Sequence, residues 1–245
     1  MSDKPIRLLI FGATGLCGRS VVERALLLDT SIQITAFVRD EERAKTFFSN
    51  LQHASKMHYH VGDIYSFDHV RDAVTRADAV ISCISSYSKP HNQMSSLTEN
   101  VLKATQTLEL EHRIRYIHFG FPRGRGDSGT SIEHAILALT EWISCTKYGP
   151  SIRDHVAVQN LLEQETNGQV DYSLFAAPAM VDTSAGKKEY YGCDGTVEMA
   201  IETSRVWNFV STRDAADLML SHLLLVMKDG QQERLLPKLM CLSYK

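Results

Sequence analysis

The sequence has little that marks a secreted, membrane-spanning or nucleic-acid-binding protein. Its five cysteines are scattered, odd in number and never spaced Cys-x-x-Cys, which argues against both a disulfide framework and a zinc knuckle. The longest late apolar run, LMLSHLLLVM, covers about half a membrane span and contains a histidine. A net charge of −3 provides no global positive field for nucleic acid or anionic lipid. We therefore expect a cytoplasmic protein with reduced thiols, no membrane contact, no nucleic-acid partner and no bound metal.

What is present is an ordinary globular composition, 44% hydrophobic and 22% charged over 245 residues. Short apolar runs alternate along the chain with segments whose apolar residues recur at helical spacing. We expect strands at 6–11, 34–38, 57–61, 78–84, 114–119 and 170–176, and helices at 19–28, 41–51, 67–74, 94–110, 131–146, 153–166 and 212–227.

This alternation predicts an α/β fold, a Rossmann-like doubly wound parallel sheet with helices on both faces. The length suits a single domain over residues 1–245. Its nucleotide-binding half would cover about 1–120 and its substrate-side elements about 120–245. Residues 182–210 form an irregular region with room for short strands, which we expect to belong to a small C-terminal substrate lobe.

The first expected strand runs directly into a glycine-rich turn that begins Gly12-Ala13-Thr14-Gly15. Gly12 permits a tight turn, Gly15 lets the backbone approach a pyrophosphate, and Gly18 allows the next helix to pack against the strand. The N–H groups that open this helix favour a negatively charged ligand. Strand, turn and helix together predict a dinucleotide-binding site, and the alternative is a tight turn that binds nothing.

The end of the second strand distinguishes two nicotinamide cofactors. A carboxylate there accepts hydrogen bonds from the ribose of NAD, whereas an arginine neutralises the 2′-phosphate of NADP. The chain places Arg39 first and Arg43 one helical turn later, which favours NADP(H). In the alternative interpretation Asp40 binds the ribose and both arginines are solvated surface charges.

The ends of the third and fourth strands complete the expected cofactor site. Asp63 and Ile64 follow the third strand and are placed to bracket an adenine ring. Ser82, Cys83 and Ile84 end the fourth strand, where ligands of open α/β sheets lie.

The segments GATGLCG, VRDEER, GDI, DAVISCI and the late VSTRDAA resemble an atypical short-chain dehydrogenase/reductase of the NmrA-like type. Within that group the chain is most similar to the biliverdin IXβ reductase and flavin reductase branch. The resemblance implies NADP contacts from Gly12, Thr14, Gly15, Leu16, Cys17, Arg39, Arg43, Asp63, Ile64, Ser82 and Cys83, and places His155, Ala177, Pro178 and Ala179 near the nicotinamide.

The proton donor that is usual in short-chain dehydrogenases is missing. Those enzymes use a tyrosine whose pKa is lowered by a lysine four residues later. None of the nine tyrosines here has a lysine at that spacing; Tyr148, for example, is followed by Ile152. The fifth strand also departs from its relatives, because it leads into Gly120 and Phe121 rather than into a serine or threonine.

His155 is the preferred candidate acid, on the helix where the lysine would be sought, and Tyr148 comes second. The alternative is that His155 is a surface residue beside charged neighbours. Beyond the fourth and fifth strands, we expect the side chains Ser85, Ser86, Tyr87 and Phe121 to line the substrate side, although the three that follow the fourth strand could equally be polar loop groups.

Three functions remain open. The leading hypothesis is an NADPH-dependent reductase, which transfers hydride to a bulky conjugated small molecule such as a flavin, tetrapyrrole, quinone or enone. The second is a redox-silent NADP-binding sensor with a protein partner, as the NmrA-like resemblance implies. The third is a cofactor-independent isomerase or cyclase on the same scaffold. We therefore lean towards an enzyme, an NADP-dependent oxidoreductase.

Two further patterns are weighed as surface features. The basic loop 123–127 could recognise an anionic substrate group but is more simply a solvated loop. His58 and His60 share one face of a strand, as two metal ligands would, yet no third ligand follows at a recognisable spacing.

Overall fold

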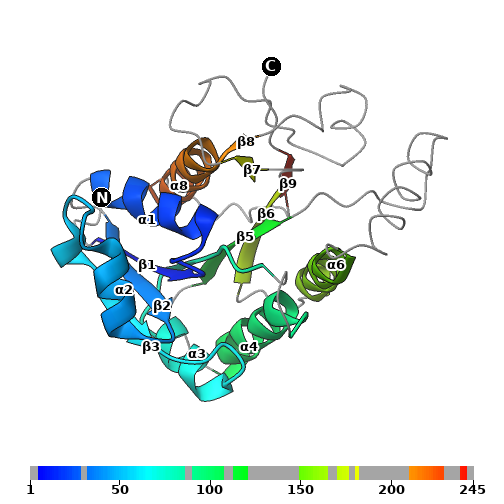
Figure 1. Cartoon of the computed structure of the whole chain (residues 1–245). Helices are drawn as coiled ribbons and strands as arrows, with labels where there is room; N and C mark the ends of the chain where they lie inside the picture. Colours follow the sequence, from blue (N-terminus) through cyan, green and yellow to red (C-terminus); the bar gives the residue numbers. More distant parts are fainter. Residues whose placement is uncertain are drawn as a thin grey trace.

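A parallel sheet lies at the centre of the computed structural model, which describes residues 5–28, 32–85, 90–107, 113–120, 149–164, 170–176, 180–181, 210–228 and 238–241 (Figure 1). Within these residues the sheet has seven strands in the order β3-β2-β1-β4-β5-β6-β9. The strands are β1 (Ile6–Phe11), β2 (Ile32–Val38), β3 (His58–Val61), β4 (Ala79–Ser82), β5 (Ile114–Gly120), β6 (Val170–Ala176) and β9 (Lys238–Cys241). A separate parallel pair joins β7 (Met180–Val181) to β8 (Val210–Ser211).

Helices cover both faces of this sheet, as Figure 1 shows. The helices are α1 (Leu16–Leu27), α2 (Glu41–Phe48), α3 (Phe67–Val74), α4 (Gln93–Thr107), α6 (Gly149–Glu163) and α8 (Thr212–Lys228), with a short 3₁₀ turn at Ala54–Lys56.

Two hydrophobic cores fill the space between sheet and helices. The residues of β1 alternate between them, since Leu8 and Ile10 pack with α1, α2 and α8, whereas Leu9 and Phe11 pack with α3, α4 and α6. A strand buried on both faces is almost wholly apolar, which explains the continuous run in β1.

The strand order reverses at β1. The chain moves from β1 outward to β2 and β3, then crosses to β4 on the other side of β1 and continues to β5 and β6. Between β1 and β4 the connections lead away in opposite directions, so a crevice opens beyond the carboxyl ends of these strands. Phe11 and Ser82 are the last pair in register at this point. The arrangement confirms the Rossmann-like doubly wound fold.

The observed elements follow the expected ones with local differences. Helix α1 begins at Leu16 and not at Arg19, because Gly15 acts as its N-cap and Gly18 lies inside the first turns. Strand β4 ends at Ser82, so the next two residues are already beyond the sheet. The expected helix at 131–146 and the irregular segment up to residue 209 lie outside the described residues.

The late apolar run belongs to α8. Met219, Leu220 and Leu223 are buried in the core shared with α1. The N-terminus of α8 is capped by the Ser211 hydroxyl, which accepts a hydrogen bond from the Asp214 N–H at 3.2 Å. In the part of the chain that is described, no helix has the length and apolar character needed to cross a membrane.

Candidate functional site

The turn after β1 is tight and is packed against the end of β4. Gly12 has a positive φ of 73°, a conformation that suits glycine. Its carbonyl accepts a hydrogen bond of 2.9 Å from the Gly15 N–H, which closes the turn. A Cβ atom at Gly12 would lie 2.8 Å from the carbonyl carbon and oxygen of Cys83. We refer to residues 12–15 as the glycine turn.

The three glycines of the motif serve different purposes. Gly18 is buried in α1, and a Cβ atom there would collide with the Gly12 carbonyl, so the helix can start only where it does because residue 18 is glycine. Gly15 is exposed, and its Cβ would meet only the Gly12 oxygen, at 3.2 Å. Packing therefore excludes a Cβ at Gly12 and Gly18, whereas at Gly15 a Cβ would require only a small shift of the Gly12 oxygen, and the exposed backbone there is open to close approach by a ligand.

The N-terminus of α1 has the properties of an anion site. Its N-cap, Gly15, provides no side-chain cap, and the first turn holds no acidic residue. The N–H groups of such a turn point outward and carry partial positive charge. A phosphate is the ligand that this combination of bare backbone and helix N-terminus favours.

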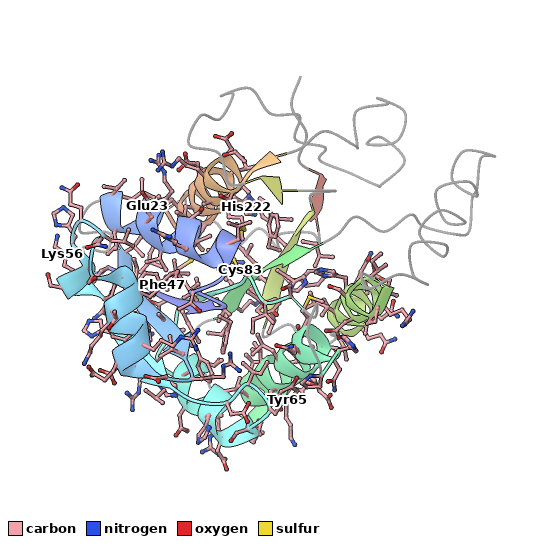
Figure 2. The ribbon with its side chains drawn as sticks, in the orientation of Figure 1. Glu23, Phe47, Lys56, Tyr65, Cys83 and His222 are labelled. Carbon is pink, nitrogen blue, oxygen red and sulfur yellow. The ribbon has the colours of Figure 1, made fainter. Side chains whose placement is uncertain are left out.

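An open groove of about 490 Å³ extends from this turn along α1. It is lined by Thr14, Gly15, Leu16, Arg19, Ser20, Glu23, Phe47 and Arg213. The guanidinium carbon of Arg19 lies 5.3 Å from the centroid of the Phe47 ring, which projects from α2 beside α1 (Figure 2). Sequence reasoning did not single out Arg19, although its place directly after Gly18 indicated a position beside the turn.

Two more arginines stand near the end of β2. Arg39 follows the strand and is exposed, and Arg43 lies in the first turn of α2, also exposed. The carboxylate between them is engaged, because Asp40 is the N-cap of α2 and accepts a hydrogen bond of 3.0 Å from the Arg43 N–H. Arg43 and Phe47 are four residues apart on α2 and so share one face of that helix.

The loop after β3 is fixed by backbone hydrogen bonds. The Gly62 N–H donates to the Val38 carbonyl at 2.9 Å, and the Asn100 side chain donates to the Ile64 carbonyl at 2.8 Å. The exposed carboxylate of Asp63 accepts from the Tyr65 N–H at 3.1 Å. The loop is therefore a preformed edge beyond the carboxyl end of β3.

Two histidines meet near the carboxyl ends of β4 and β5. His118 of β5 is in register with Ser82 of β4, and its Nε2 atom lies 3.1 Å from Nδ1 of His155 on α6. A Cβ atom at Gly120 would lie 2.6 Å from that Nδ1, so the glycine that ends β5 makes room for the imidazole. His155 is consequently half-buried against β5 and is not a free surface side chain.

Burial keeps this histidine pair neutral. Desolvation lowers the pKa of His155 to about 4, with Asp154 opposing the shift. Desolvation and the neighbouring His155 together place the pKa of His118 well below its ordinary value. Both imidazoles are therefore uncharged at neutral pH, and each has one N–H donor and one acceptor nitrogen.

A buried tyrosine lies beside the pair. The Tyr116 hydroxyl shares a hydrogen bond of 2.9 Å with the Thr98 hydroxyl. Burial raises the pKa of Tyr116 to about 12, and the nearby Thr98 and Ser82 hydroxyls oppose that shift. Tyr116 accordingly stays protonated, and Gly120 stands four residues later, where a lysine would activate it.

Three buried polar atoms in this region lack a hydrogen-bond partner among the described residues. They are Oγ of Ser82, Nδ1 of His118 and Oγ of Ser151. Ser151 lies one helical turn before His155, on the same face of α6. Unpartnered polar atoms are costly to bury, so each of these three would gain from a hydrogen bond to water or to a polar ligand.

Comparison with known proteins assigns the family. The sequence profile of the NAD(P)H-binding family matches residues 12–221. The chain belongs to the NAD(P)H-binding family. None of the curated protein sequences matches it significantly.

Solved structures show the same fold at low sequence identity. An NADP complex of a wide-type short-chain dehydrogenase/reductase from Veillonella parvula is 14% identical, with a TM-score of 0.66, covering 98% of this chain and 95% of that one. The oxidoreductase ylbE from Lactococcus lactis is 17% identical, with a TM-score of 0.63 and coverages of 98% and 91%. A Rossmann-fold NAD(P)-binding protein from Shigella flexneri is 14% identical, with a TM-score of 0.58 and coverages of 94% and 90%.

In this NAD(P)H-binding protein the expected site residues fall into two groups. The first group lies at or beyond the carboxyl ends of the strands. It comprises the expected residues of the glycine turn, of α1, of the ends of β2, β3 and β4, and of α6, together with the exposed Ser85. Tyr148, Ser86, Tyr87, Phe121, the loop 123–127 and Ala177, Pro178 and Ala179 lie outside the described residues.

The two histidines of β3 take separate surroundings. The Nε2 atom of His58 is 2.9 Å from the side-chain nitrogen of Gln33, and the ring of His60 stacks on Phe37. Among the residues that the structure describes, no group of three metal-binding side chains comes together.

Proposed function

We propose that the protein is an NADPH-dependent reductase of the NmrA-like group, which transfers hydride to a bulky conjugated acceptor. The observation that carries the proposal is the state of Gly15. It is an exposed glycine, less restricted by packing than Gly12 or Gly18, at the uncapped N-terminus of α1, and it lines the groove. A pyrophosphate is the ligand whose charge and close approach account for all three features.

NADP is favoured over NAD by arginines at the groove and at the end of β2. Arg39 and Arg43 follow β2, Arg19 lines the groove from α1 and lies over the Phe47 ring of α2, and the competing carboxylate of Asp40 accepts a hydrogen bond as a helix cap. Guanidinium groups bind phosphate through charge-assisted hydrogen bonds. We expect Arg39 and Arg43 to hold the 2′-phosphate, with Arg19 as an additional cation held in place by Phe47. The neighbour from Veillonella parvula, which was solved with NADP, supports this choice.

The nicotinamide end of the dinucleotide would supply hydride beside β4 and β5. There the described residues offer hydrogen-bonding groups and, among them, no ready source of protons. His155 and His118 are neutral, and Tyr116 holds its proton firmly. We therefore propose that His155 orients the acceptor by a hydrogen bond and that the proton comes from water. Flavins and quinones fit such a site, because their reduced forms tolerate negative charge.

A decrease of absorbance at the nicotinamide band tests the reductase. Purified protein is mixed with NADPH and separately with a flavin, a quinone and an enone. The expected result is NADPH consumption with the flavin or the quinone, and a His155→Gln variant that loses activity while it still binds NADPH. An NADPH that binds tightly but is consumed with none of the acceptors contradicts the proposal.

That outcome is the one expected of the second candidate, a redox-silent NADP sensor. The observation that favours the sensor is the missing tyrosine–lysine pair, because a sensor needs the dinucleotide-binding glycine turn but no proton donor. A sensor would change its affinity for a protein partner when NADPH binds, and a pull-down with and without NADPH separates the two candidates.

A further inference from the structure

Two cysteine side chains meet between the start of α1 and the end of β4. The Cys83 thiol donates a hydrogen bond to Cys17, and their sulfur atoms are 3.7 Å apart. Cys17 is buried in the first turn of α1, and Cys83 is half-buried one residue beyond β4, beside α1 (Figure 2). Sixty-six positions separate the two in the sequence, so only the fold brings them together.

We propose that Cys17 and Cys83 are a redox modification site, at which hydrogen peroxide forms a reversible disulfide that weakens binding of the dinucleotide. This inference rests on the proposed function, because it assigns regulation to the same dinucleotide site, the glycine turn and the start of α1. The Cys17 sulfur attacks one peroxide oxygen and breaks the O–O bond, and the departing hydroxide takes the Cys17 proton, which yields a sulfenic acid and the first water. The Cys83 sulfur then attacks the Cys17 sulfur, and the departing hydroxyl takes the Cys83 proton as the second water. Two thiols lose two electrons and one peroxide gains them.

The two thiols differ in a way that suits these roles. The hydrogen bond to Cys17, together with burial, raises the pKa of Cys83, so Cys83 is a thiol in the reduced protein and loses its proton only as its sulfur attacks the Cys17 sulfenic acid. Cys17 lies in the first turn of α1, and the hydrogen bond from Cys83 already places the two sulfur atoms face to face.

We expect disulfide formation to disturb the glycine turn and the start of α1. A disulfide bond is about 2.0 Å long, so the sulfur atoms have to approach each other. Cys83 is held in place, because its N–H donates to the Phe11 carbonyl at 3.0 Å and its own carbonyl abuts Gly12. The start of α1 is therefore the part that moves. Its N–H groups, from Leu16 to Gly18, are those proposed to bind the pyrophosphate.

The test uses a full-length variant in which Cys145, Cys193 and Cys241 are serine, so that the pair supplies the only thiols. The protein is treated with hydrogen peroxide, and peptide mass spectrometry identifies any linkage. NADPH affinity is then measured by nicotinamide fluorescence for the reduced, the oxidised and the re-reduced samples. Should the triple variant fail to fold, peptide mapping of the natural chain identifies the same linkage.

We expect a linked peptide pair and an affinity for NADPH that falls about tenfold on oxidation and returns on reduction. By reciprocity, saturating NADPH should make disulfide formation less favourable by the same factor. The matched control adds Cys83→Ala, which leaves Cys17 able to form a sulfenic acid but no disulfide. Its oxidation-dependent loss of affinity should be smaller.

Absence of the Cys17–Cys83 linkage overturns the inference, and so does a linkage that leaves NADPH affinity unchanged. Failure of the proposed function gives a different result, because the reduced protein would then bind no NADPH at all. Without NADPH binding there is no effect of oxidation on affinity to measure. Mass spectrometry would still decide whether Cys17 and Cys83 form a disulfide.

Discussion

The carboxylate of Asp154 on α6 accepts a hydrogen bond of 2.8 Å from the backbone N–H of Met94, in the first turn of α4. Its second oxygen accepts one of 3.1 Å from the Ser95 N–H. A carboxylate from one helix thus caps the N-terminus of another, which satisfies two N–H groups and complements their partial charge. The contact also fixes the segment of α6 that presents His155 to β5.

We predict that Asp154→Ala lowers the free energy of unfolding by about 1–3 kcal/mol, because two N–H groups lose a buried acceptor. Asp154→Asn retains one acceptor oxygen and should cost less. Urea denaturation measures both effects. Asp68→Ala removes an exposed carboxylate with a surface ion pair and should change stability by no more than about 0.5 kcal/mol. Equal losses for Asp154→Ala and Asp68→Ala would refute the capping role.

Stability should fall as the pH drops below about 6.5. His155 has a folded-state pKa of about 4, whereas an unfolded histidine titrates near 6.5. Between these values the unfolded state binds a proton that the folded state does not, so the stability present above pH 6.5 is lost on acidification. His118 acts in the same direction.

Replacing the histidine isolates this effect. The dependence of unfolding free energy on pH between 6.5 and 5 should be shallower for His155→Gln than for the natural protein, by up to about 1 kcal/mol per pH unit. Chemical denaturation at several pH values provides the measurement. His58→Gln, an exposed control, should follow the natural protein, and a His155→Gln curve parallel to it would show that His155 does not contribute.

Two glycine variants should separate packing from ligand binding. Gly18→Ala introduces a methyl group against the Gly12 carbonyl and should lower the melting temperature by several degrees. Gly15→Ala replaces the N-cap glycine and brings a methyl group 3.2 Å from one oxygen, so it should lower the melting temperature by less than Gly18→Ala, while NADPH affinity falls at least about tenfold. Thermal unfolding with and without NADPH measures both. Unimpaired NADPH binding by Gly15→Ala would contradict the assignment of this turn to a pyrophosphate.

Arg39→Ala should remove most of the preference for NADP over NAD. Loss of a charge-assisted hydrogen bond to phosphate costs about 1.5–3 kcal/mol, or roughly 10- to 150-fold in affinity, and NAD lacks that phosphate. Titration with both cofactors gives the ratio. Arg76→Ala, at an exposed arginine that follows α3, is the charge-matched control. If the preference for NADP over NAD persists in each of Arg39→Ala, Arg43→Ala and Arg19→Ala, another part of the chain binds the 2′-phosphate.

The central sheet and the glycine turn could be predicted, because the sequence patterns that indicate them are local. An apolar run such as Ile6–Phe11 can be buried on both faces only in a central strand, and the spacing of Gly12 and Gly18 follows from backbone sterics alone. The sequence predicts that this helix starts at Arg19, because it places Gly18 in the turn. The structure has Gly18 inside α1, which starts at Leu16.

The remaining contacts depend on how separate elements are placed. His118 and His155 are 37 positions apart, and Cys17 and Cys83 are 66 apart. Neither pair forms a motif in the sequence, since each results from the register of β4 with β5 or from the packing of a helix on the sheet. The stacking of Arg19 on Phe47 likewise joins two helices whose mutual position no local pattern specifies.

The central position of β1 has a consequence for protein synthesis. Among the described strands β1 leaves the ribosome first, and it pairs with β2 as soon as residues 32–38 follow. Its other edge waits for β4, at residues 79–82. Unpaired apolar edges invite association with other chains. We therefore expect the nascent polypeptide to be vulnerable to aggregation in the interval between the synthesis of β2 and β4, when a ribosome-bound chaperone would protect the open edge of β1.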